Sequence, residues 1–199
     1  MRNIHVGFGA SPIVGWENYD NSFSLFLAKF PYGIITTLYW IKLLNLKQFD
    51  FIKFNKKNCI NRLDASKKLP FKDAEISVIY TSHMIEHLSQ KTAIDFFREC
   101  NRVPVNLGVL RVSVPDFQIL IDQYGRDRDV DKFLRESHLV ISNDQNMLQK
   151  FKNLISGYRH HQHMYNGSSL VKVLLSCGFS EAKIMKPGEI NIIDPGELN

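Results

Sequence analysis

Short apolar runs alternate with amphipathic segments across residues 64–124, and this is the clearest pattern in the chain. Ile76–Tyr80 (ISVIY) is a continuous β-branched run, which is typical of a strand buried on both faces. Ser89 is placed to cap a helix whose apolar residues recur at helical spacing. Val109–Val114 is a second predicted strand, after a turn at Asn106–Gly108. The pattern therefore predicts parallel strands joined by helices.

The flanking segments extend the same alternation. Three strands are predicted before this region, at Arg2–Ala10 (which includes a glycine turn), Gly15–Asp20 and Cys59–Leu63. After it we expect helices at Asp127–Ile141, Leu148–Ile155 and Ser168–Cys177. Strands are expected at Ala182–Met185 and Ile190–Ile193. A single α/β domain spanning 1–199 follows, with a mostly parallel sheet.

Residues 22–46 form the most apolar part of the chain. Phe23, Phe26, Leu27 and Phe30 share one helical face, and the break at residues 31–33 (Pro-Tyr-Gly) should end that helix. A membrane-spanning helix needs about 20 apolar residues, and the break argues against one here. Three interpretations stay open: a helical substrate cover, an interfacial membrane helix, or a dimer surface. We favour a helical and basic insertion at 22–58 that covers the substrate.

The composition adds two constraints. The chain has 199 residues, 44% of them apolar, which suits one folded domain rather than a disordered segment. Its three cysteines lack a CxxC pair, and its N-terminus lacks a signal-peptide pattern, so we expect a cytoplasmic protein, with peripheral membrane contact left open. Residues 47–72 carry eight Lys or Arg and two Asp, which we interpret as a solvated lysine-rich loop rather than an anion-binding patch.

Several motifs, in their order and spacing, resemble one branch of the class I S-adenosylmethionine-dependent methyltransferases. The branch has an aspartate, Leu-Pro-Phe, a strand, a histidine, Glu-His-Leu, Arg-Val, a glycine turn and a segment ending Ser-Val-Pro-Asp. Here these elements are Asp64, Leu69-Pro70-Phe71, Ile76–Tyr80, His83, Glu86-His87-Leu88, Arg102-Val103, Gly108 and Arg111–Asp116. The resemblance covers most of the chain outside roughly residues 22–58. It implies a Rossmann-like fold with helices on both faces of the sheet and a helical insertion after the second strand.

The resemblance also implies the cofactor, S-adenosylmethionine, and the residues that bind it. By position in the motifs these are Gly7, Gly9, Asp20, Asn21, Asp64, Ala65, Ser82 and His83. The glycines would let the backbone approach the cofactor, Asp20 would accept hydrogen bonds from the ribose, and Asp64 would accept one from the adenine amino group. His5 and Ser11 depart from the family pattern, which usually has an acidic residue and a third glycine there.

For the reaction, the resemblance implies methyl transfer to an oxygen or nitrogen of a small molecule or saccharide. His83, at the mouth of the fourth strand, and His163, in a segment that resembles the family's His-x-Met-Tyr-Asn, are the candidate bases. No nucleic-acid partner is expected, contact with a membrane surface through 22–57 stays open, and the oligomeric state is undetermined.

Two other functions compete with this one. His83-x-x-Glu86-His87 matches a zinc peptidase signature, but only Ser89 separates its end from a new helix, so the metal-binding helix would be one turn long. His160, His161 and His163 cannot all face one way on a regular element. We therefore predict no metal site. The altered glycine motif also keeps open a methyltransferase-like protein that binds without catalysis.

Overall fold

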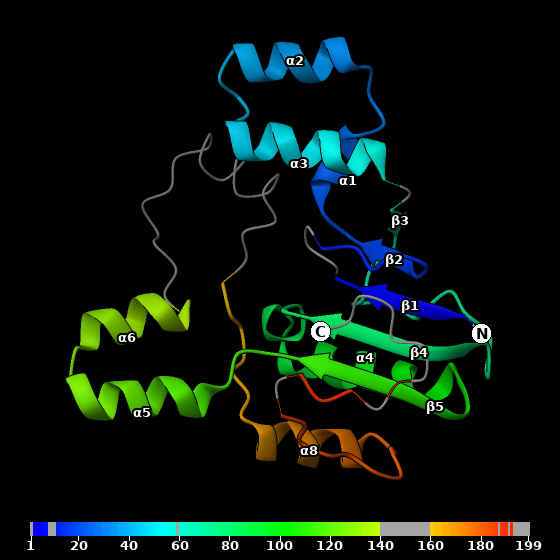
Figure 1. Cartoon of the computed structure of the whole chain (residues 1–199), viewed down its shortest axis with the longest axis vertical. Coiled ribbons are helices and arrows are strands. Elements are labelled where there is room, and N and C mark those ends of the chain that lie inside the picture. The colour runs from blue at the N-terminus through cyan, green and yellow to red at the C-terminus, as the bar shows by residue number, and fades with distance from the viewer. Residues whose placement is uncertain are drawn as a thin grey trace.

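The computed structural model describes residues 2–7, 11–58, 60–139, 160–186, 188–190 and 192. Its five described strands form one parallel sheet in the order β3-β2-β1-β4-β5 (Figure 1). The strands are β1 (Asn3–Val6), β2 (Glu17–Asp20), β3 (Asn61–Arg62), β4 (Ile76–Ser82) and β5 (Pro104–Ser113). The helices are α1 (Phe23–Leu27), α2 (Tyr32–Trp40), α3 (Leu46–Lys57), the 3₁₀ turn η1 (Ile85–His87), α4 (Gln90–Arg102), α5 (Phe117–Asp127), α6 (Val130–Ser137) and α8 (Gly167–Ser176). The predicted parallel α/β fold is confirmed.

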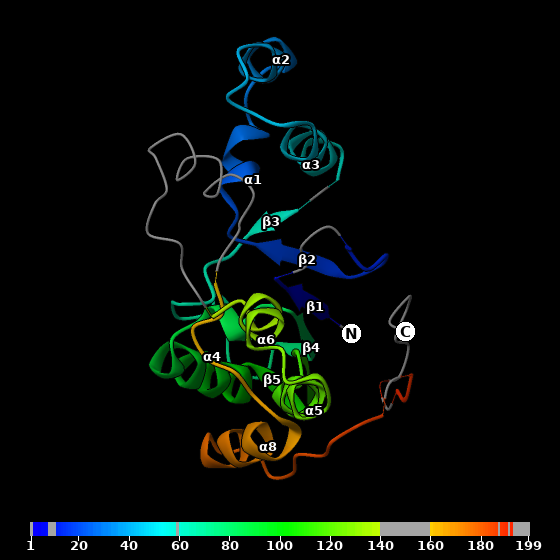
Figure 2. The same ribbon diagram turned by 90° about the vertical axis from the view of Figure 1, so that its left-hand side faces the viewer.

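Helix α4 covers one face of the sheet (Figure 2). Its buried residues Ala93, Phe96, Phe97 and Cys100 pack with the β-strand residues of the larger core, and Ser89 caps its first turn by accepting from the Thr92 amide. A 3.6-residue repeat of apolar side chains places these four on one side of the helix. Helix α8 adds Leu170 to the same core.

The Leu-Pro-Phe loop is fastened to the end of α4. Arg102 donates to the carbonyls of Leu69 and Phe71 at 3.3 and 3.1 Å, and Glu99 accepts from the Leu69 amide at 2.9 Å. Glu99 and Arg102 are themselves paired at 2.6 Å, and this pairing holds the pKa of Glu99 below its ordinary value. The Leu-Pro-Phe motif and the Arg102 of the Arg-Val motif thus have a structural role, because they bind one another.

The opposite face of β1 and β4 is covered by the β1–β2 loop and the chain near the C-terminus. Ile13, Trp16 and Ile192 pack there against Val78. The Asn18 side chain organises the loop, since it accepts from the Ile13 amide and donates to two loop carbonyls. Parallel crossovers normally contain a helix of their own. Here residues 11–16, the described part of the loop, form none.

The insertion after β2 is a separate helical head. Helices α1, α2 and α3 have their own small core, built from Leu27, Ala28, Ile35, Leu44 and Ile52, and project beyond β2 and β3 (Figure 1). The predicted helical insertion is confirmed. The prediction that the lysine-rich stretch begins as a loop is wrong, because residues 46–57 form α3. Asn45 begins that helix with a capping box to Gln48.

The connection into β5 also differs from the prediction. Asn106–Gly108 was expected as a turn before a strand at Val109, but β5 begins at Pro104 and this segment is a bulge within it. Leu107 has a positive φ of 64° and is 92% exposed, while a Cβ on Gly108 would lie 2.5 Å from that of Pro104. The extra residues of the bulge, which have no partner in β4, explain both the positive φ of Leu107 and the close approach of Gly108 to Pro104.

The C-terminal predictions have mixed outcomes. Asp127–Ile141 contributes the shorter helix α6, capped by Asp129, and Ser168–Cys177 matches α8 within one residue. The strand predicted at Ala182–Met185 is wrong, because these residues form no strand. Leu148–Ile155 lies outside the described residues, as does part of the predicted strand at Ile190–Ile193.

His5 of β1 lies on the face of the sheet opposite α4, beside Tyr80 of β4, and is 2% exposed. Its ring contacts that of Tyr80, with centroids 4.8 Å apart. Burial lowers the pKa of His5 from 6.5 to about 4. A hydrogen bond with Asn18 raises this pKa, but by less than burial lowers it. His5, one of the two residues that depart from the family pattern, is therefore a neutral core side chain.

His5 should make the protein less stable in mild acid. Between pH 6.5 and about 4 the unfolded chain protonates this imidazole while the folded chain does not. The free energy of unfolding should therefore fall by about 1.4 kcal/mol for each pH unit lost in that window. Chemical denaturation of wild type and His5→Gln, at neutral pH and near the lower end of this pH window, measures the change in the free energy of unfolding. A wild-type pH dependence equal to that of His5→Gln would contradict the assignment.

Candidate functional site

Most of the candidate residues lie along the carboxyl edge of the sheet. Strand β1 stands between β2 and β4, with Val6 paired to Tyr19 on one side and to Thr81 on the other. The residues that follow these three, Gly7, Asp20 and Ser82, consequently leave the sheet at one level. The chain order reverses at β1, and such a switch point is where open parallel sheets bind ligands.

The turn after β1 requires glycine for two reasons. Gly7 has a φ of 77°, which side-chain-bearing residues rarely adopt, and its amide donates to the Tyr19 carbonyl at 2.8 Å. A Cβ on Gly7 would lie 2.6 Å from Cγ of Met84, so the side chain that follows β4 closes over this turn. Met84 is a site residue that the sequence analysis did not identify. Gly9, the second predicted glycine, lies outside the described residues.

Asp20 and Asn21 end β2 beside the end of β3. Asp20 pairs in register with Arg62, and its carboxylate accepts from the Asn21 amide at 2.7 Å. The side-chain Oδ1 of Asn21 accepts from Arg62 Nε at 3.3 Å. A carboxylate and an amide are thus held together beside the Gly7 turn, which suits hydrogen bonding to the hydroxyl groups of a sugar.

Asp64 shapes the turn that leaves β3. Its Oδ1 accepts from the Ser66 amide and hydroxyl at 3.0 and 2.6 Å, and Lys67 Nζ lies 3.6 Å from Oδ2. The pKa of Asp64 is below its ordinary value, because these hydrogen bonds and the lysine charge outweigh the burial that would raise it. The neighbouring Ala65 is buried. Asp64 therefore stays ionised near neutral pH, with one oxygen engaged in the turn.

His83 follows β4 in a conformation that favours a site role. Its φ is 50°, its amide donates to the Ser113 carbonyl at 2.9 Å, and its side chain is 67% exposed. A left-handed backbone at a non-glycine residue is costly, and such residues concentrate at functional sites. The imidazole Nδ1 lies 3.4 Å from Oε1 of Glu86, which is buried. Ser82 precedes it as the last residue of β4.

The segment 160–165 lies against η1, far from it in the sequence. The Glu86 carbonyl accepts from the amides of Gln162 and His163, at 2.7 and 3.3 Å. His163 packs its ring edge against Tyr165 at a centroid distance of 4.7 Å. The backbone carbonyl of Tyr165 in turn accepts from the Phe117 amide at the start of α5. These contacts hold the backbone of His163 against η1, which follows β4 and His83 in the chain.

The zinc peptidase interpretation fails on geometry. It needs His83 and His87 one helical turn apart, but Ile85–His87 is a single 3₁₀ turn and His83 precedes it with a positive φ. Instead, Glu86 and His87 lie beside His161, and the three could hold a metal ion. Burial lowers the pKa of His161 and favours its neutral form.

The described site thus belongs to a parallel α/β sheet with a switch-point edge, and the fold is shared with known enzymes. A SAM-dependent methyltransferase of Thermotoga maritima matches with a TM-score of 0.52 and 14% identity, over 90% of this chain and 64% of that one. One from Archaeoglobus fulgidus gives 0.51 and 14%, over 91% and 62%. PigF, solved with SAH, gives 0.50 and 13%, over 93% and 47%.

These comparisons show the class I methyltransferase fold. The chain spans about half to two-thirds of the length of these solved structures. No family model matches the sequence, and no curated protein is similar to it. None of the helices in the described ranges is long and apolar enough to cross a bilayer.

Two glycines allow the Gly7 turn to be tested against a matched control. Gly15 has a φ of 80°, close to that of Gly7, but a Cβ there would meet nothing within 4 Å. Gly15→Ala should cost about 1–2 kcal/mol of stability through backbone strain alone. Gly7→Ala should cost at least about 1 kcal/mol more, because the methyl group collides with Met84.

Chemical denaturation of both variants measures this difference. Adding Met84→Ala to Gly7→Ala should recover part of the excess loss, since it removes the colliding side chain. Equal losses in Gly7→Ala and Gly15→Ala would show that Met84 does not close over the turn.

Proposed function

We propose that this protein binds S-adenosylmethionine and transfers its methyl group to an oxygen or nitrogen of a small molecule or saccharide. The observation that carries the proposal is the alignment of Gly7, Asp20 and Ser82 at the switch point, with Asp64 at the next strand end. Methyltransferases with the same fold support it. Gly7 would admit the cofactor, Asp20 and Asn21 would hold its ribose, and Asp64 with Ala65 its adenine.

The protein's task in such a reaction is mainly positioning. The cofactor's sulfonium activates the methyl group, so the site must align donor and acceptor and exclude water. His83 is exposed at the β4 end and would face the acceptor. For a hydroxyl acceptor, His83 or His163 would accept its proton, and for an amine, alignment suffices.

Titration of the purified protein with S-adenosylhomocysteine tests the cofactor assignment. We expect micromolar binding to wild type in isothermal titration calorimetry. Asp64→Ala should abolish it, because the adenine amino group loses its acceptor. Ser66→Ala is the matched control: it removes a hydrogen bond to the Asp64 carboxylate and leaves the carboxylate in place.

The two variants separate binding from turn structure. If Ser66→Ala weakens binding as much as Asp64→Ala does, Asp64 acts only through the turn. If folded wild type binds no S-adenosylhomocysteine, the enzyme proposal fails and the non-catalytic binding protein takes its place.

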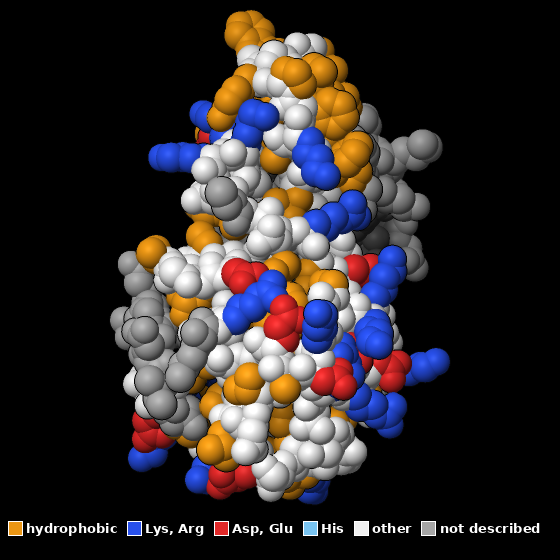
Figure 3. Space-filling model, turned by 90° about the vertical axis from the view of Figure 1, so that its right-hand side faces the viewer, with side chains coloured by type: hydrophobic (Ala, Val, Ile, Leu, Met, Phe, Trp, Pro, Cys, Tyr) orange, Lys and Arg blue, Asp and Glu red, His pale blue; other side chains and the backbone are white. Residues whose placement is uncertain are grey.

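We also propose that the helical head formed by α1, α2 and α3 docks on an anionic lipid surface. Trp40, Ile41 and Leu46 lie close together in the sequence at the end of α2 and the start of α3, and are 79%, 59% and 59% exposed. Figure 3 shows hydrophobic side chains gathered at this end of the molecule, with Lys and Arg side chains beside them. Exposed apolar groups that are clustered this way mark an interaction surface.

Charge favours lipid as the partner. The exposed charged residues of the head are Lys29, Lys42, Lys47, Lys53 and Lys57, against one acidic residue, Asp50. A sixth lysine, Lys56, is used internally, since its Nζ donates to the carbonyls of Ala28 and Phe30. Lysines near an anionic bilayer contribute about 1 kcal/mol each, and an aromatic residue inserts at the headgroup level. The head would then present the acceptor site to the membrane.

Trp40 provides its own probe of lipid docking. The other tryptophan, Trp16, is 9% exposed, so a change in the environment of Trp40 dominates the fluorescence response. Vesicles containing phosphatidylserine should shift the emission to shorter wavelength, and added salt should reverse the shift. The shift should be lost in Trp40→Phe and weakened in Lys42→Gln with Lys47→Gln.

Phosphatidylcholine vesicles are the control and should leave the spectrum unchanged. An unchanged spectrum with both lipids would overturn the proposal. Concentration-dependent dimerisation in the absence of lipid would assign the surface to a second copy of the chain instead.

A further inference from the structure

Glu86 has an unusual environment for a carboxylate. Its residue is 1% exposed, and neither carboxylate oxygen has a hydrogen-bond partner among the residues that the structure describes. The nearest cationic candidate is His83, with Nδ1 3.4 Å from Oε1. Burying an ionised carboxylate without hydrogen bonds is costly, so native proteins pair such groups with a cation or a metal. Both carboxylate oxygens of Glu86 are therefore available to bind a cation.

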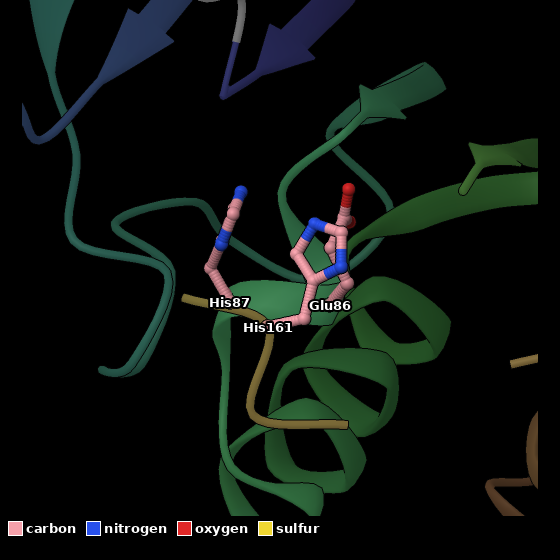
Figure 4. A group of neighbouring side chains, drawn as sticks. All are labelled: Glu86, His87 and His161. Carbon is pink, nitrogen blue, oxygen red and sulfur yellow. The ribbon is translucent and has the colours of Figure 1, made fainter. Parts of the chain in front are cut away.

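Two histidines complete a set of ligand atoms around it. Glu86, His87 and His161 each offer one atom, and these atoms lie within 4.8 Å of one another (Figure 4). The rings of His87 and His161 have centroids 5.1 Å apart. His161 is 8% exposed, and its Nδ1 also has no hydrogen-bond partner among the described residues. Two buried residues therefore present unpaired polar atoms to the same place.

The surrounding hydrogen bonds hold the set in position. His87 Nδ1 lies 3.3 Å from the His160 carbonyl, and donation there leaves Nε2 as the metal-binding nitrogen. Gln162 donates its side-chain amide to the His87 carbonyl and its backbone amide to the Glu86 carbonyl, both at 2.7 Å. The His161 amide donates to the His138 carbonyl. Such outer contacts commonly orient the ligands of metal sites.

We propose that Glu86, His87 and His161 form a zinc-binding site. Two imidazoles and a carboxylate suit Zn²⁺, which takes tetrahedral nitrogen and oxygen ligands. Three protein ligands leave a fourth position for water or another oxygen ligand. The site would join η1, at the end of β4, to the segment 160–165. Sequence analysis predicted no metal site, and the proposal does not depend on cofactor binding.

Zinc binding to the full chain tests the site directly. After chelator treatment and buffer exchange, wild type should bind one Zn²⁺ in a calorimetric titration and unfold at a higher temperature with it. Substituted Co²⁺ should give the visible absorption of a tetrahedral site. His161→Gln removes a ligand and should weaken Zn²⁺ binding by more than the roughly 10- to 100-fold typical of losing an outer contact to a ligand. His83→Gln should leave it unchanged, because His83 is not a ligand.

Glu86→Gln distinguishes a metal ligand from a structural residue. Without zinc this variant should be at least as stable as wild type, because it replaces a buried unpaired carboxylate with a neutral amide. With zinc, wild type should gain stability and the variant should not. The proposal is overturned if wild type binds no zinc, if His161→Gln binds it equally well, or if His83→Gln loses it while His161→Gln does not.

Discussion

The structure depends on the register that fixes β1 between β2 and β4. Val6 pairs with Tyr19 on one side and Thr81 on the other, so three strands end at one level. A shift of one residue would exchange the faces of β1: Ile4 and Val6 would leave the core that contains α4, and the polar His5 would enter it. Core packing therefore fixes the register, and the register fixes which side chains reach the carboxyl edge. The candidate site follows from the core.

The sequence was sufficient where the signal is local. The β-branched run at Ile76–Tyr80 predicts β4, and Ser89 caps α4 as its position in the sequence predicts. Asp116 and Asn166 cap α5 and α8 in the same way. Helix α3 was missed because its lysines and phenylalanines lack a clear apolar face, although Asn45 and Gln48 already form a visible capping-box pair. Tertiary contacts with α1 and the head core supply what that helix lacks.

Features that depend on long-range pairing could not be predicted. The bulge at Asn106–Gly108 exists because residues on both sides of it pair with β4. His161 is 75 residues from Glu86, so the motif around Glu86 gave no indication of its neighbour. The motif residues at the carboxyl edge are identifiable from the sequence, but Met84 and the grouping of Glu86, His87 and His161 are not.

The environment of Glu86 constrains what the region after β4 can do. A carboxylate this deeply buried must be neutralised by a proton, a cation or a metal. The nearby backbone amides of Gln162 and His163 donate to the Glu86 carbonyl, so they are unavailable to its carboxylate. Burial holds His161 towards its neutral form, so this imidazole does not balance the charge. A divalent cation would bind the carboxylate and both imidazoles together, whereas a proton on Glu86 acts on the carboxylate first and binds neither imidazole nitrogen as a metal would. The metal therefore accounts for more of the observed geometry than protonation does.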